Sequence, residues 1–171
     1  EGKGLHQLTR DMLAETVEMN VPAFINDNVP PQERDVAGLV QWVRSQFPVE
    51  VVTSEFEDLD SEAVIEKLAA RTCDLLDERR RSLGEERADE LERYVLLQVM
   101  DTKWKDHLHA MDQLRSGIGL RAYAQKDPVV AYKVEGYDMF QSMIEAIKEE
   151  VASLVLRLQP VEEYEAEGIW Q

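Results

Sequence analysis

Two long amphipathic segments separated by a short break constrain the fold of this chain more than any other feature. Apolar residues of the first segment recur at heptad spacing or fill in beside it: Leu97, Met100, Trp104, Leu108, Met111, Leu114 and Ile118. The second segment has a 4,3 heptad pattern made by Tyr137, Phe140, Ile144, Ile147, Val151, Leu154 and Leu158. Such stripes are typical of helices that pack lengthwise against a partner helix.

The break between the two segments contains Lys126-Asp127-Pro128. Pro128 disfavours helix at Asp127 and suits the first turn of a following helix. A connection of roughly six to eight residues can join two such helices only as antiparallel neighbours. The sequence therefore predicts a long helical hairpin, with its turn roughly 30 to 45 Å from its base at 1.5 Å per helical residue.

The rest of the chain is also expected to be helical. Apolar periodicity, capping side chains and breaking prolines predict further helices over residues 5–20, 35–46, from Asp60 or Ser61 onward, and 86–121. Gly84 is expected to end the third of these helices, and residues 49–56 are expected to be extended. The predicted fold class is all-α: a small helical domain followed by a long antiparallel two-helix hairpin.

Charge is distributed unevenly along the chain, whose net charge is −16. Residues 1–90 hold 10 Lys/Arg against 21 Asp/Glu, residues 91–159 hold 9 against 10, and residues 160–171 add four Glu as an acidic tail. Nucleic-acid binding is not expected, because it requires a positive face that displaces counterions. Around the predicted turn the sign reverses, because only Asp127 opposes Arg115, Arg121, Lys126 and Lys133.

Composition indicates a soluble protein of a reducing compartment. No run approaches the ~18 consecutive apolar residues of a membrane-spanning helix, and no leader segment follows Glu1. The lone Cys73 excludes an internal disulfide. We therefore expect a cytoplasmic chain that is a fragment of a longer protein.

No catalytic motif emerges from the sequence. The phosphate-binding pattern GxxxxGK[ST] is missing, and EGKG at residues 1–4 does not replace it, so no ATP hydrolysis is expected from this chain alone. His107 and His109 lie two positions apart and so face different sides of a helix, which argues against a metal site built with the nearby aspartates. His6 and Cys73 are expected to serve packing only. Tyr123, in the turn, is as consistent with a partner contact as with an ordinary turn residue.

One stretch has a specific resemblance. VMDTKWKDHLHAMDQLRSGIGLRAYAQKDP, followed by AYKVEGYDMFQSMIEAIKEEV, closely resembles the two-helix finger of SecA, the motor ATPase of bacterial protein export. The resemblance implies a helical wing domain at residues 1–89 and a helical-scaffold finger at residues 90–159. The chain differs from the family in having Ala122 where glycine is usual, and Val134 and Gly136 where Arg and Ser are more frequent.

The resemblance implies roles for particular residues and partners. Tyr123, with Arg121, Gln125 and Lys126, would contact the translocating preprotein and the SecY channel. Packing against other domains and regulation would involve Trp104, Met111, Arg115 and Phe140. ATP and magnesium would bind in the remaining SecA motor domains, with no cofactor in this chain. The parent would act at the inner face of the cell membrane, possible homodimer formation included.

In the family the finger packs along a long scaffold helix that precedes the wing. Because this chain begins after that helix, we expect exposed apolar surface near Leu97, Trp104 and Phe140. The alternative hypothesis is a stand-alone helical-hairpin adaptor that binds partner proteins. A reading frame that extends several hundred residues upstream into a Walker-A motif would favour the motor, and a third, enzymatic hypothesis through Asp101, Asp106 and His107 would require bound metal.

Overall fold

The computed structural model describes residues 2–121 and 127–158. Its α-helices are α1 (Gly2–Asn20), α2 (Val36–Gln46), α3 (Ser61–Leu83), α4 (Glu85–Arg121) and α5 (Pro128–Arg157). Short 3-10 helices are η1 (Val21–Ala23), η2 (Pro31–Glu33) and η3 (Thr53–Glu55). The described residues contain no strand, and the all-α prediction is confirmed.

Local sequence signals account for the helix boundaries. The Asp60 carboxylate accepts a hydrogen bond from the Ala63 backbone N–H at 2.8 Å and so caps α3, as predicted. Gly84 ends α3 with a φ of +84°, a conformation that side-chain-bearing residues rarely adopt. Asp127 caps α5 by accepting from the Val129 N–H, and Pro128 occupies the first helical position.

The expected extended stretch over residues 49–56 is only partly present. Val52 is extended, but Thr53–Glu55 forms η3. The reason is local: the Glu55 carboxylate accepts from the Val52 backbone N–H at 3.0 Å, which stabilises a tight turn in place of a strand.

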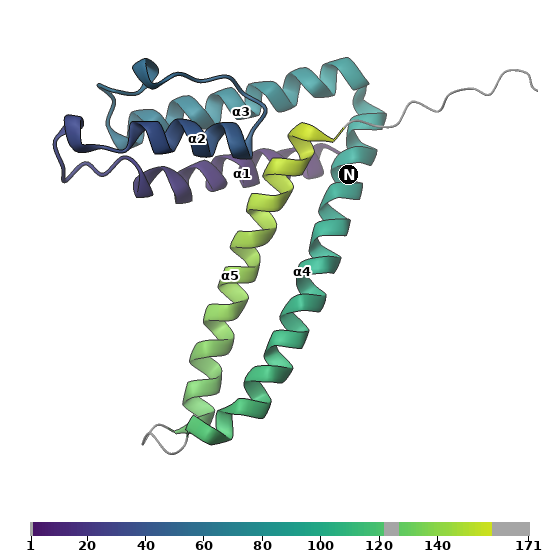
Figure 1. The fold of residues 1–171 in the computed structure, drawn as a ribbon. Coiled ribbons are helices and arrows are strands. Elements are labelled where there is room, and N and C mark those ends of the chain that lie inside the picture. Colours follow the sequence, from purple (N-terminus) through teal and green to yellow (C-terminus); the bar gives the residue numbers. More distant parts are fainter. Residues whose placement is uncertain (1, 122–126, 159–171) are drawn as a thin grey trace, which may run out of the picture.

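The first three α-helices form a compact base, with α1 and α3 beside each other and α2 next to them (Figure 1). Their buried apolar side chains form one cluster that includes Leu13, Val17, Leu39, Val43, Phe47, Phe56, Val64 and Leu68. The C-terminal part of α5 enters the same cluster through Ala152, Val155 and Leu156, each at most 1% exposed. The hairpin therefore shares a core with the base.

Helices α4 and α5 extend away from the base side by side (Figure 1). A second buried cluster holds them together, made of Val95, Val99, Met143, Ile147 and Val151. They run antiparallel, since Lys103 pairs with Glu150 at 2.6 Å whereas His107, further along α4, lies against the earlier Phe140. The predicted side-by-side pairing of the two long helices is present in the described residues.

The side of α4 that faces α5 differs from the predicted stripe near the base. Val95 and Val99 are 1% and 3% exposed, whereas Leu97 and Trp104 are 60% and 48% exposed. Each residue turns an α-helix by about 100°, so Leu97 lies on a different side from Val95. The heptad count identified an apolar stripe correctly but assigned it to the wrong neighbour.

The exposed stripes of the two helices form an open apolar face. We define this open face by Leu97, Met100, Trp104, Leu108, Val134, Tyr137 and Phe140, all classed as exposed. The rings of Trp104 and Phe140 both lie against His107, at centroid distances of 5.7 and 6.0 Å, so residues of both helices contribute to one side of the hairpin. The expected exposure near Leu97, Trp104 and Phe140 is confirmed.

We predict that the isolated chain self-associates through the open face, because contiguous exposed apolar surface of several hundred Å² seeks a partner. Analytical ultracentrifugation over increasing concentration should show species larger than a monomer. The double variant Leu97→Glu/Trp104→Glu should shift the distribution to monomer. Val52→Glu changes an exposed apolar residue of the base and should leave association unchanged. A wild-type chain that stays strictly monomeric at high concentration contradicts this prediction.

Candidate functional site

The predicted contact residues at the turn are only partly within the described residues. Arg121 is the last residue of α4. Tyr123, Gln125 and Lys126 lie outside the described residues. Asp127, which follows them, is the exposed cap of α5. The α4 and α5 ends are therefore defined on both sides of the turn.

The predicted packing residues lie on the distal two-thirds of the hairpin. Trp104 and Phe140 belong to the open face, and Met111 is half-buried between the helices. A Cβ atom at Gly136 would lie 3.0 Å from the Met111 Cε, so the glycine allows Met111 to pack closely on α5. Arg115 is exposed, and no contact within the described chain occupies its guanidinium.

The other end of the hairpin is fastened to the base by polar contacts to backbone carbonyls. The Arg79 guanidinium of α3 donates to the carbonyls of Leu156 and Leu158, at the end of α5. These are among the last carbonyls of a helix, which have no intrahelical partner. Burial lowers the pKa of Arg79, which reflects its partial removal from water. The Gln46 amide donates to the Glu149 carbonyl at 2.7 Å and links α2 to the same helix.

Ion pairs add further links around the hairpin's base. The Lys103 ammonium lies 2.6 Å from the Glu150 carboxylate and joins α4 to α5. Lys148 of α5 pairs with Glu15 of α1. The flanking side chains are partly exposed, so each pair contributes little by itself, about 0 to 1 kcal/mol. Together with the shared apolar core they fix the direction in which the hairpin leaves the base.

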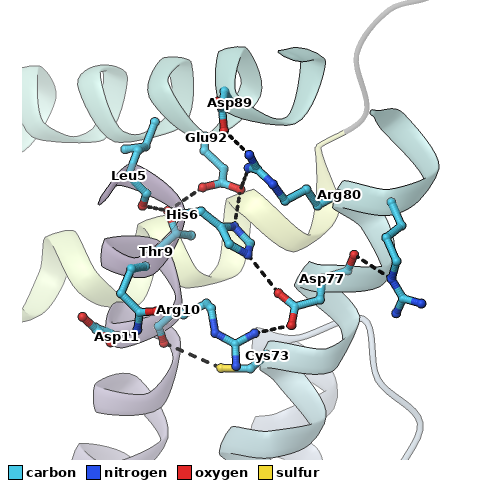
Figure 2. A network of polar contacts seen from close by, with 12 residues as sticks. Leu5, His6, Thr9, Arg10, Asp11, Cys73, Asp77, Arg80, Asp89 and Glu92 are labelled. Carbon is cyan, nitrogen blue, oxygen red and sulfur yellow. Dashed lines mark hydrogen bonds and ion pairs between the residues drawn. The ribbon is translucent and has the colours of Figure 1, made fainter. Parts of the chain in front are cut away.

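A polar network occupies the junction of α1, α3 and α4 (Figure 2). His6 contacts Glu92 and Asp77 with its two ring nitrogens, so its role exceeds the predicted packing. Cys73 is buried, and burial raises the pKa of its thiol, as expected for a packing cysteine. No sequence spacing signals the His6 contacts, because its partners lie 71 and 86 positions away along the chain.

The described residues offer no arrangement typical of an enzyme site. No group of three or more His, Cys, Asp or Glu gathers in them to hold a metal ion. A shallow open groove between α2, α4 and α5 is lined by Gln46, Lys103, Ala146, Glu149, Glu150 and Ser153. The charged pair and amide that line this groove already serve the contacts described above.

Over the described part of the chain, no helix is both long and apolar enough to cross a membrane.

Comparison with known proteins matches this architecture. The family model described as SecA Wing and Scaffold domain matches residues 1–159. The protein translocase subunit SecA of Carboxydothermus hydrogenoformans is 42% identical over 170 residues, which are 98% of this chain and 20% of that protein. The corresponding subunit of Desulforamulus reducens is 39% identical over 159 residues, which are 92% of this chain and 18% of that protein.

The chain thus spans about a fifth of the length of the relatives that it matches. The family match covers the base and the described hairpin, from α1 to the end of α5. Identity to both relatives extends over more than nine-tenths of this chain. The chain belongs to the SecA family, in which it corresponds to the wing and scaffold region.

Proposed function

We propose that this chain is the wing and two-helix finger of a SecA-type motor subunit. Residues 1–89 form the wing, residues 90–159 the finger and residues 160–171 an acidic tail. The finger contacts the translocating preprotein and the SecY channel, and it regulates ATPase activity and couples it to transport. That activity resides in motor domains outside this chain. The family match and the relatives' description as translocase subunits support this proposal.

The observation that carries the proposal is the burial of the α5 base in the core of the wing. Ala152, Val155 and Leu156 pack among wing side chains, and Arg79 holds the end of the same helix. Helix α4 contains 37 residues, so at 1.5 Å per residue it reaches about 55 Å. A displacement of the wing is therefore transmitted along stiff helices to the turn, as a mechanical role requires.

The open face supports contact with the remaining motor domains. Its apolar side chains have no partner in the described chain, and Trp104 and Phe140 supply large rings at its middle. In SecA-like motors a long scaffold helix would cover this face. Trp104, Met111, Arg115 and Phe140 would then pack between domains and relay the nucleotide state to the finger.

The turn is the proposed contact with the polypeptide in transit. A tyrosine contacts many different side chains, through its apolar ring and through a hydroxyl that both donates and accepts hydrogen bonds. Arg121, Gln125 and Lys126 would meet carbonyl and acidic groups at the channel mouth, an interaction that salt weakens. The working motor would accordingly lie at the inner face of the cell membrane, with ATP and magnesium bound in its other domains.

Tyr123→Ala tests the proposed contact. In an intact motor that carries this region, the variant should reduce preprotein transport about tenfold or more, equivalent to ~1.4 kcal/mol of lost stabilisation. Tyr123→Phe should retain most transport, since it keeps the ring. Helicity and melting of the chain should change little, because turn substitutions away from the core are usually within about 0.5 kcal/mol.

A tyrosine elsewhere on the same helix pair provides the matched control. Tyr94 is 61% exposed on α4, near the base, and Tyr94→Ala should leave transport unchanged. If Tyr123→Ala unfolded the hairpin, or if Tyr94→Ala reduced transport equally, the proposed contact of Tyr123 would be wrong.

The proposal also predicts that this chain has no nucleotide chemistry of its own. Calorimetric titration of ATP and magnesium into the chain should give no binding heat, and phosphate release should stay at the level of buffer, because the sequence has no phosphate-binding loop. Saturable binding in the micromolar range would overturn the assignment of ATPase activity to other domains.

A further inference from the structure

His6 joins three helices at the root of α4. Its Nδ1 lies 2.9 Å from Glu92 Oε1 of α4, and its Nε2 lies 2.9 Å from Asp77 Oδ1 of α3 (Figure 2). The His6 side chain is 18% exposed and that of Glu92 is 2% exposed. One imidazole thus bridges two carboxylates on helices that follow each other across Gly84.

The partners of His6 specify its protonation. Ionised carboxylates only accept hydrogen bonds, and a neutral imidazole has a single N–H to donate. Both contacts are therefore satisfied only when both ring nitrogens carry protons. A neutral ring would place one nitrogen lone pair against a carboxylate oxygen.

Both carboxylates have other donors that favour their ionised form. The Thr9 hydroxyl donates to Glu92 Oε2 at 3.1 Å, and Arg80 lies 3.4 Å from Glu92 Oε1. Burial works against ionisation of Asp77, but hydrogen bonds from Arg10 and His6 outweigh it and lower the pKa of this carboxyl. Asp77 is therefore a carboxylate throughout the range in which histidine titrates.

The charged groups around His6 come from every helix of the junction. Helix α1 contributes Arg10, α3 contributes Asp77 and Arg80, and α4 contributes Glu92 and Asp89, the last paired with Arg80 at 2.6 Å. Cys73 lies beside Arg10, and its raised pKa keeps the thiol protonated near neutral pH. Nearby α5 supplies the apolar Val155.

We propose that His6 is a protonation-dependent clasp that holds the root of α4 against α1 and α3. With the proton present, the imidazolium satisfies both carboxylates and the junction is tight. As pH rises and the proton is lost, one contact becomes repulsive and the root of α4 opens more often. The sign is therefore a tighter junction at lower pH. The inference concerns this chain alone and does not depend on the proposed transport role.

The clasp has a consequence for the hairpin. The α4 root includes Glu92 and lies one helical turn before Val95, where the buried contacts with α5 begin. A loosened root frees the base end of α4 while α5 remains held in the wing core by Val155 and Leu156. The proton on His6 thus tunes how firmly one of the two finger helices is fixed to the wing.

Amide hydrogen exchange of the chain at pH values of about 6 and 8 tests the clasp. After correction for the intrinsic exchange rate, the opening constant of residues 85–99 should rise roughly fivefold between these values, the factor equivalent to about 1 kcal/mol. His6→Gln keeps an amide in place of the imidazole but cannot titrate, so its opening constant should not change with pH. Asp77→Asn removes one carboxylate and should weaken the pH dependence.

The other histidines provide the control. The double variant His107→Gln/His109→Gln removes the titrating groups of the hairpin and should keep the full pH dependence at residues 85–99. An opening constant that does not vary with pH in the wild type would overturn the proposal. So would a pH dependence that survives in His6→Gln or disappears in His107→Gln/His109→Gln.

Discussion

The burial of the α5 base inside the wing is the interaction on which the rest of the structure depends. Ala152, Val155 and Leu156 complete a core that α1, α2 and α3 form from the other side. Because core packing is close to that of a crystal, this contact leaves little freedom for the hairpin to tilt. Arg79 reinforces it by satisfying carbonyls at the end of α5.

The two hairpin helices are fixed to the wing by different physics. Helix α5 is held by apolar burial, whereas the root of α4 is held largely by the charged network of His6, Glu92 and Arg80. Apolar burial does not vary with proton concentration, but a network containing histidine does. Further out, burial declines and the helices expose the open face. The molecule is thus most firmly packed at the root and most available for contact toward the turn.

Local and periodic signals allowed much of the fold to be predicted. Asp60, Gly84 and Pro128 act through their own backbone or immediate neighbours, so their roles follow from the sequence alone. Heptad spacing identified the long helices for the same reason. It could not distinguish the stripe of Val95 and Val99 from that of Leu97 and Trp104, because both are apolar and only the position of α5 decides between them.

The candidate sites depended on information that local patterns do not contain. The role of Tyr123 came from a family resemblance and stays a prediction, as does the division into domains at residue 89. The His6 contacts were missed because Asp77 and Glu92 are brought to it only when α1, α3 and α4 pack together. A histidine surrounded by mixed residues in an amphipathic helix has no spacing that distinguishes a bridge from ordinary packing.

The central claim is that the wing and the hairpin form one cooperative unit through the α5 base. Two single-tryptophan chains, one retaining Trp42 beside Phe47 of the wing and one retaining Trp104 on the hairpin, test it directly by denaturant unfolding. Each reports one part of the molecule. The account predicts that the two fluorescence transitions coincide in midpoint and in slope, as in a two-state domain. A hairpin transition at clearly lower denaturant than the wing transition would contradict it.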